Sequence, residues 1–263
     1  MTFLISYGTN VGKVRRSNED KYLVFSEEHN LCNDKDQIGS IEIINHTKNS
    51  FNIAICVLDG MGGMGNGDVA SEILSKKILQ TLNGKDSQLT PIELLLDANR
   101  HLLNFKQTNP KFGPMGAVGT LAFLKSQEIW IAHVGDTRAY IIQNQKIQQI
   151  TEDQTYVNAL VKSGVISASD ARSHPQRNII NNCLGQIEPL NPLNYIWKWN
   201  PGDKLLLCSD GLTNELSDKE LQAILTQASG IPALEELFRQ SLGKSGSDNI
   251  TLIVAEYRNS ATN

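Results

Sequence analysis

The feature that most constrains the fold is the hydrophobic period, which changes in blocks along the 263-residue chain. Near the start, runs rich in β-branched and aromatic residues predict strands; they are FLISYG (3–8), KYLVF (21–25), IEIIN (41–45) and FNIAICVLD (51–59). From Asp68 the apolar residues recur every four positions, as on one face of a helix; they are Ala70, Leu74, Ile78 and Leu82. A second helix should follow, because Thr90 and Pro91 form a cap and a first-turn proline.

The same blocks return in the rest of the chain. Four closely spaced strand signals between residues 117 and 150 predict an antiparallel meander; they are AVGTLAFL, EIWIAHV, TRAYIIQ and KIQQI. The last third offers the strands YIWKW, KLLLCSD and NITLIVAEY, with helices predicted at 218–226 and 232–242. Because strand blocks and helix pairs are segregated, we predict an α+β layered sandwich with antiparallel sheets, spanning residues 1–263 as one domain.

Composition and charge exclude several classes of partner. The net charge is −4, the pI is near 5.8, and the Lys and Arg residues are scattered, so we expect no nucleic-acid partner. No segment approaches the roughly 20 apolar residues of a membrane helix, and the N-terminus does not resemble a signal peptide, so no membrane association is expected. The four cysteines are far apart and form no C-x-x-C pair, which predicts free thiols in a cytoplasmic protein. A monomer is the default expectation.

A glycine-rich loop, VLDGMGGMGNGDVAS at residues 57–71, raises a nucleotide-binding alternative. Its Gly60, Gly62 and Gly65 fit the G-x-G-x-x-G pattern of a dinucleotide loop. A dinucleotide fold places this loop after its first strand and follows it with a helix that leads to a parallel strand. Here several strands precede the loop and the next helix leads to another helix, so a nucleotide-binding oxidoreductase is disfavoured. Retention of NAD(P) on purification would support it.

Carboxylates recur where apolar strands end. Asp59, Asp136 and Asp210 each lie where an apolar run meets a glycine, and Asp248 lies where a Gly-Ser turn enters the last strand. Carboxylates gathered at such edges repel one another unless a divalent cation neutralises them. Oxygen ligands suit Mg²⁺ or Mn²⁺, and the backbone carbonyl of Gly60 can join them because glycine lets the chain approach an ion closely.

The segment GKVRRSNED at residues 12–20 adds a second set of candidates. An arginine there can hold a phosphate with two parallel hydrogen bonds, and from the chemistry alone Arg15 and Arg16 are equally eligible. Glu19 or Asp20 can hold metal-bound water from outside the ligand shell.

These segments resemble the metal-dependent protein serine/threonine phosphatases of the PP2C or PPM family, and the bacterial branch in particular. The matching motifs run in the family's order from residue 12 to residue 254, and they are GKVRRSNED, VLDGMGGMGNGDVAS, GTLAFL, IAHVGDTRAY, LLLCSDGLTNELSD and SGSDNITLIV. The resemblance implies a four-layer αββα sandwich, in which two antiparallel sheets are flanked by helix pairs. It also implies a centre of two Mn²⁺ or Mg²⁺ ions and hydrolysis of phosphoserine and phosphothreonine on proteins.

The resemblance assigns the metal ligands. Asp59 would bridge the two ions, the carbonyl of Gly60 would bind one of them, and Asp210 and Asp248 would complete the protein ligands. Asp136 corresponds to the family's contributor to a weaker third metal.

The resemblance also assigns the residues that act on the phosphate. Arg15, four residues before Glu19 as in the family pattern, would bind the phosphate, and Asp20 would orient metal-bound water. A bridging water activated by the two ions would then attack phosphorus without a phosphoenzyme. Phosphorylated proteins, including a cognate serine/threonine kinase, are the implied partners. The alternative is a pseudophosphatase that uses the fold as a sensor or binding module. The intact Asp59, Asp210 and Asp248 argue against it.

Several features lie outside the catalytic motifs. Residues 163–182 predict an exposed flap over the site, and its His174 is a candidate for substrate contact. Residues 26–50 predict a surface excursion that is longer than the connection of compact relatives. His133 lies in a strand and is interpreted as a packed or hydrogen-bonded structural residue. Gln154 stands where many relatives carry histidine.

Met61 departs from the animal members of the family, in which a histidine at this position protonates the leaving oxygen. Because Met61 cannot donate a proton, a metal-bound water is our hypothesis for the acid. We therefore expect the pH profile of kcat/KM to show no ionisation at about pH 6.5, where an imidazole would titrate. Initial rates with a phosphothreonine peptide between pH 5 and 9 will test this, and an ionisation of that kind in wild type would contradict it.

Overall fold

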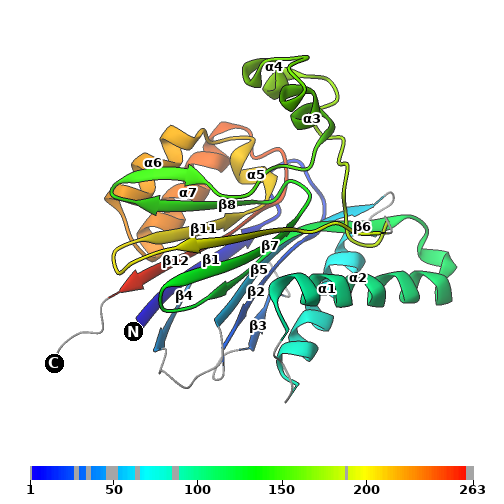
Figure 1. Ribbon diagram of the computed structural model, residues 1–263. Helices are drawn as coiled ribbons and strands as arrows, with labels where there is room; N and C mark the ends of the chain where they lie inside the picture. Colours follow the sequence, from blue (N-terminus) through cyan, green and yellow to red (C-terminus); the bar gives the residue numbers. More distant parts are fainter. Residues whose placement is uncertain are drawn as a thin grey trace.

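Two antiparallel sheets stack face to face between layers of helices (Figure 1). The computed structural model describes residues 2–26, 30–33, 37–45, 53–62, 66–84, 89–186 and 189–258, and within these ranges each sheet has six strands. The first sheet has the order β4 (Gln37–Asn45), β1 (Thr2–Asn10), β12 (Ile250–Arg258), β11 (Lys204–Cys208), β8 (Arg138–Gln143), β9 (Lys146–Gln149). The second has the order β10 (Leu193–Lys198), β7 (Glu128–Val134), β6 (Met115–Leu124), β5 (Ile53–Gly62), β2 (Asp20–Phe25), β3 (Asn30–Cys32).

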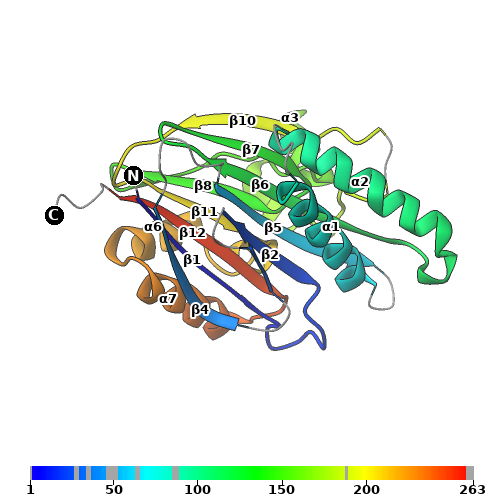
Figure 2. The same cartoon turned by 90° about the horizontal axis from the view of Figure 1, so that it is seen from below.

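Helices cover the outer face of each sheet (Figure 2). The second sheet is covered by α1 (Gly67–Leu82) and α2 (Pro91–Thr108), and the first by α5 (Asp210–Thr213), α6 (Asp218–Gln227) and α7 (Ile231–Lys244). The two remaining helices, α3 (Tyr156–Lys162) and α4 (Ala168–Ser173), project from the body in Figure 1. The α+β class and the four-layer arrangement implied by the sequence are therefore confirmed.

Three apolar layers hold these four layers together. The central one lies between the sheets and includes Phe3, Ile55, Ile131, Leu207 and Ile253. A second joins α1 and α2 to their sheet, and a third joins α5, α6 and α7 to theirs. Because both faces of the inner strands are covered, β6 is buried along its whole length and its sequence reads as a continuous apolar run.

The predicted start of α2 is confirmed in atomic detail. The side chain of Thr90 accepts a hydrogen bond from the backbone N–H of Glu93 at 3.3 Å, and the Glu93 carboxylate accepts one from the N–H of Thr90 at 2.7 Å. This reciprocal pair satisfies donors that the first helical turn leaves without partners. The same device starts α4 at Ser167 and Asp170. Helix α4 lies inside the segment predicted as a flap or loop, so the flap contains a helix.

The segment predicted as a surface excursion, residues 26–50, contains strands, of which residues 41–45 were predicted and residues 30–32 and 37–40 were not. It supplies an edge strand to each sheet, β3 beside β2 and β4 beside β1. The polar composition that suggested a loop is also that of sheet edges, which face water along one side. Residues 27–29, 34–36 and 46–50 of this segment lie outside the described ranges.

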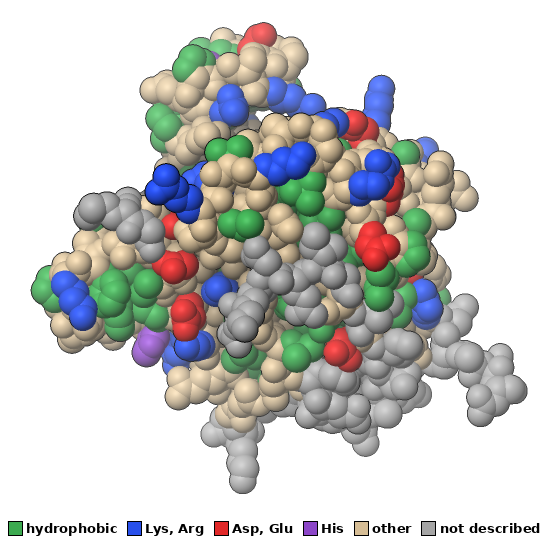
Figure 3. Space-filling view, turned by 180° about the vertical axis from the view of Figure 1, so that it is seen from behind, with side chains coloured by type: hydrophobic (Ala, Val, Ile, Leu, Met, Phe, Trp, Pro, Cys, Tyr) green, Lys and Arg blue, Asp and Glu red, His purple; other side chains and the backbone are tan. Residues whose placement is uncertain are grey.

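The cysteines are free thiols, as their spacing predicted, and the surface carries charges of both signs (Figure 3). Acidic and basic side chains are interspersed on the face shown in Figure 3. All four cysteines are free; Cys56, Cys183 and Cys208 are buried, and Cys32 is partly exposed. None of the helices in the described ranges has the length and apolar character needed to cross a bilayer.

Two isoleucines on neighbouring strands test the central apolar layer. Ile131 on β7 is fully buried between the sheets, whereas Ile196 on the paired edge strand β10 is 55% exposed. We expect Ile131→Ala to lower the free energy of unfolding by about 2–5 kcal/mol, because it leaves a cavity that the sheets cannot close. The matched control Ile196→Ala should change it by less than about 0.5 kcal/mol. Urea unfolding followed by tryptophan fluorescence measures both, and similar losses in the two variants would contradict the described layering.

Candidate metal centre

The strand register of the second sheet places two predicted site residues side by side. Asp20 begins β2 and pairs directly with Asp59 on β5. Asp20 is only 1% exposed, and its Oδ2 accepts a hydrogen bond of 2.7 Å from the hydroxyl of Ser209. Ser209 directly follows β11, a strand of the first sheet. Asp20 therefore ties the two sheets together at the end where the other carboxylates emerge.

Gly60 occupies a position that no larger residue fits. A Cβ atom at Gly60 would lie 2.2 Å from the carbonyl oxygen of Gly67 and 2.6 Å from that of Glu19. Its N–H donates to the Glu19 carbonyl at 3.2 Å. The glycine thus lets the backbone at residues 19, 60 and 67 meet beside Asp59. The absence of a side chain also lets the Gly60 carbonyl approach an ion closely.

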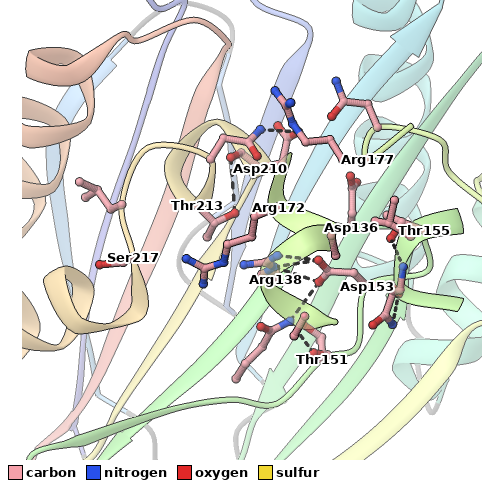
Figure 4. Close-up of a pocket in the computed structure, with 18 of the residues that line it drawn as sticks. Asp136, Arg138, Thr151, Asp153, Thr155, Arg172, Arg177, Asp210, Thr213 and Ser217 are labelled. Carbon is pink, nitrogen blue, oxygen red and sulfur yellow. Dashed lines mark hydrogen bonds and ion pairs between the residues drawn. The ribbon is translucent and has the colours of Figure 1, made fainter. Parts of the chain in front are cut away.

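The first sheet contributes two further carboxylates from neighbouring strands. Asp210 directly follows Ser209 at the end of β11 and begins α5, and its Oδ2 accepts a 3.0 Å hydrogen bond from the amide of Asn214. Asp248 precedes β12, the strand that pairs with β11, and its Oδ2 lies 2.7 Å from the guanidinium of Arg15. Asp136 comes from the turn between β7 and β8 and lines the same cavity as Asp210 (Figure 4).

Five aspartates form what we call the carboxylate cluster: Asp20, Asp59, Asp136, Asp210 and Asp248. Desolvation and mutual repulsion raise the pKa values of the first four. Burial is the largest cause in each resolved case, and it raises the pKa of Asp20 to about 7 and that of Asp210 to about 6. The pKa values of Asp59 and Asp136 are raised well above the usual range by burial and by neighbouring aspartates. The charges of Asp20, Asp136, Asp210 and Asp248 all act on Asp59, so the predicted aspartates lie near one another in the structure.

The donor set fits a hard divalent cation. The cluster offers oxygen atoms only, and its nearby cations are the guanidinium groups of Arg15 and Arg138. Among the described residues, no three acidic, histidine or cysteine side chains already close around one point. Carboxylates repel one another until a cation neutralises them, so an ion of the Mg²⁺ or Mn²⁺ type would be needed to draw these together.

The N-terminal loop brings Arg15 and Glu19 to the centre. Arg15 bonds to Asp248, and this hydrogen bond is the main cause that raises its pKa. Glu19 acts here through its backbone, because its N–H donates to the Asn249 side chain at 2.8 Å and its carbonyl accepts from the Ser71 hydroxyl at 2.6 Å. Burial and the nearby Asp68 raise the pKa of the Glu19 carboxyl.

Sequence reasoning missed a set of supporting residues around the centre. Arg138 forms a bidentate ion pair with Asp153, in which Nε lies 2.9 Å from Oδ1 and Nη2 lies 2.6 Å from Oδ2. Asn249 donates to two carbonyl oxygens of the N-terminal loop, at Val11 and Ser17. A charged residue inside the otherwise apolar run TRAYIIQ was the available signal for Arg138. The partners of Asn249 are far away in the chain, so no local pattern indicates its role.

His133 is a structural residue, as the sequence suggested. It is fully buried, and its ring nitrogens lie 2.9 Å from the Thr120 hydroxyl and 3.0 Å from the Gly135 carbonyl oxygen. Burial lowers the pKa of His133 to about 4, so the ring is neutral. Gln154 accepts a hydrogen bond of 2.8 Å from the N–H of Gly135 and so supports the turn that carries Asp136.

A cavity of about 1070 Å³ opens beside Asp136 and Asp210. The flap lines one side, with Arg172 and Arg177, and the loop after α5 lines the other (Figure 4). His174 is not among its lining residues, and its Nδ1 accepts a hydrogen bond within the flap from the N–H of Gln176.

Comparison with known proteins places the chain among phosphatases. The family described as Protein phosphatase 2C matches residues 29–251. The serine/threonine phosphatase Stp of Listeria innocua is 30% identical over 258 residues, which cover 95% of this chain and 94% of that protein. The crystal structure of the serine/threonine phosphatase Stp1 from Staphylococcus aureus superposes with a TM-score of 0.82 at 29% identity, covering 97% of this chain and 95% of that one. The catalytic domain of the phosphatase PstP, solved in complex with 2 manganese ions, has the same fold, with a TM-score of 0.78 at 23% identity and coverage of 98% and 100%.

The cost of holding Asp20 without a cation can be measured as stability. Its folded-state pKa is raised to about 7 from the ordinary 3.8 of an aspartate, so the stabilisation by the neutral form is present below about pH 4 and is lost as pH rises toward 7. Asp20→Asn keeps the group neutral. We expect it to stabilise EDTA-treated protein by about 1–3 kcal/mol at pH 8, after allowing for the weaker hydrogen bond from Ser209, and by less at pH 5.

Urea unfolding at the two pH values, without metal and with saturating Mn²⁺, tests this. Saturating Mn²⁺ should remove the difference in free energy of unfolding between Asp20→Asn and wild type. If metal-free Asp20→Asn protein is no more stable than wild type at pH 8, then the ionised Asp20 carboxylate does not destabilise the folded protein, and the prediction is wrong.

Proposed function

The chain belongs to the protein phosphatase 2C family and is a protein serine/threonine phosphatase, and from this premise we propose that its carboxylate cluster is the catalytic metal centre. The observation that carries the proposal is the convergence of five aspartates from both sheets with too few cations to balance them. The reaction is the hydrolysis of phosphoserine and phosphothreonine on proteins.

We propose that Asp59, the Gly60 carbonyl, Asp210 and Asp248 hold two ions, Mn²⁺ or Mg²⁺, and that Asp136 serves a weaker third. When bound, such ions lower the pKa of a bridging water and neutralise charge on the phosphoryl oxygens. Two manganese ions are present in the structure of PstP, but for this chain the proposal rests on its own carboxylates. Asp20 lies beside Asp59 in the register and can orient the attacking water.

Arg15 is the proposed phosphate-binding residue. Its side chain is 53% exposed and is paired with Asp248, which is 29% exposed. An exposed ion pair contributes at most about 1 kcal/mol, so Arg15 can exchange this partner for a phosphate at little cost. A guanidinium binds a phosphate with two parallel hydrogen bonds, which fixes the orientation of the phosphorus for attack. Glu19 holds the backbone of this loop against Asn249.

The cavity beside the centre is proposed to receive the substrate polypeptide. Its opening lies next to Asp136 and Asp210, so a phosphorylated side chain can reach the centre while its flanking residues lie along the flap. Arg172 and Arg177 would then favour acidic residues near the phosphorylated one. We further propose that the protein acts as a cytoplasmic monomer on phosphorylated proteins, including a cognate serine/threonine kinase.

Activity that depends on the metal centre is the direct test. We expect hydrolysis of p-nitrophenyl phosphate and of a phosphothreonine peptide to require Mn²⁺ or Mg²⁺ and to stop in EDTA. Asp210→Ala should lower kcat/KM by about 10³-fold or more, because it removes a ligand from ions that stabilise the transition state. Circular dichroism and thermal melting confirm that the variant is folded. Full activity in EDTA, or in Asp210→Ala, would exclude the proposed centre, and a folded wild type without turnover in either metal would favour the pseudophosphatase alternative.

A further inference from the structure

Glu215 lies outside the carboxylate cluster and contacts the turn that carries Asp248. It comes five residues after Asp210, in the loop that follows α5. Its Oε2 accepts a hydrogen bond of 3.1 Å from the N–H of Ser245, and its Oε1 accepts one of 3.2 Å from the hydroxyl of Ser247. The hydroxyl of Ser245 also donates to Oε1. Both oxygens of one carboxylate are thus engaged by the residues just before Asp248.

The backbone of Glu215 is held to the same region. The ammonium group of Lys244, the last residue of α7, donates to the Glu215 carbonyl oxygen at 2.7 Å and lies 2.8 Å from the carboxylate of Glu220. Burial raises the pKa of the Glu215 carboxyl, but the hydrogen bonds from Ser245 and Ser247 outweigh it and lower the pKa overall. The group is therefore an ionised acceptor at neutral pH.

The turn at residues 245–248 joins α7 to β12 and has no regular structure of its own. On its other side the N-terminal loop presses against it, because a Cβ at Gly12 would lie 2.2 Å from the carbonyl oxygen of Asp248. The N–H of Lys13 donates to the Gly246 carbonyl at 2.8 Å. The turn is therefore contacted on one side by the loop that carries Arg15 and on the other by Glu215.

Asp210 is fixed by the residues around Glu215. Asn214, the preceding residue, donates through its side chain to Asp210 Oδ2 at 3.0 Å and through its backbone to the Asp210 carbonyl at 2.7 Å. Ser209 joins this segment to β12 through its N–H, which donates to the Thr251 carbonyl at 2.9 Å. The segments that carry Asp210 and Asp248 are thus joined near Ser209, and Glu215 provides a second connection. A single connection leaves the relative orientation of the two loops free, whereas two connections fix both their separation and their orientation.

We infer that Glu215 is a positioning residue that holds Asp248 at the correct place relative to Asp210 and thereby sets the affinity of the centre for its metal ions. The inference rests on the proposed function, in which these two aspartates are ligands. Without Glu215, the turn must be ordered when the ion binds, so part of the binding free energy is lost as conformational entropy. Outer-shell partners of metal ligands change metal affinity by about 10–100-fold. Glu215 also lines the cavity proposed for the substrate, so Mn²⁺ binding without substrate is the measurement that isolates its effect on the metal centre.

The test is Mn²⁺ binding to the full-length, EDTA-stripped protein by isothermal titration calorimetry at pH 7.5. We expect Glu215→Ala to weaken Mn²⁺ binding by about tenfold or more. Glu235→Ala, an exposed glutamate on α7, is the matched control and should bind as wild type does. A Ser245→Ala/Ser247→Ala double variant removes the two hydroxyl donors and keeps the backbone N–H of Ser245 that bonds to Glu215 Oε2, so it should reproduce part of the loss. Combined with Glu215→Ala it should add little.

The outcomes separate this inference from its premise. Wild-type Mn²⁺ affinity in both Glu215→Ala and the serine double variant, with binding abolished in Asp210→Asn, would overturn the role of Glu215 and leave the proposed centre intact. Wild-type affinity in Asp210→Asn as well would overturn both. A lower melting temperature of the metal-free variants with unchanged Mn²⁺ affinity would show that Glu215 is structural only, and so would also overturn the inference.

Discussion

The repulsion among aspartates at one end of the stacked sheets is the constraint on which the rest of this structure depends. Burial and neighbouring charges raise the pKa values of Asp20, Asp59, Asp136 and Asp210, so the ionised cluster opposes folding until a cation is bound. A centre of this kind can persist only on a scaffold that is stabilised elsewhere. The three apolar layers and the long buried strands provide that stability.

The two sheets divide the work of holding the centre. The second sheet brings Asp20 and Asp59 together by register alone, since neighbouring strands fix their separation. The first sheet ends in loops at Asp210 and Asp248, and these need side-chain contacts to hold their positions. Ser209 links the two sheets through Asp20, while Asn249 ties the N-terminal loop to the end of the last strand. The proposed ligands are thus held by strand pairing where strands carry them, and by side-chain hydrogen bonds where loops carry them.

Much of the fold follows from local patterns. The strand blocks, the helix pairs and the cap at Thr90 could be predicted, because alternation, four-residue periodicity and capping are properties of neighbouring residues. The strand at residues 41–45 was predicted, whereas residues 30–32 and 37–40 were assigned to a polar excursion, because an edge strand and a polar loop have similar compositions and only pairing with β1 and β2 separates them. Helix α4 was missed although Ser167 and Asp170 carry a capping signal, since a six-residue helix shows too little periodicity to detect.

The sequence by itself determined which chemical groups are available: oxygen ligands at strand ends, two adjacent arginines, and a methionine where animal relatives use histidine. It could not rank Arg15 over Arg16 without the family pattern, and the structure adds that Arg15 reaches Asp248. Only the tertiary structure decided how Glu215 is used, because its partners lie about thirty residues further along the chain. Ligand identity is encoded in single residues, whereas ligand position depends on distances between segments that meet only after the sheets have stacked.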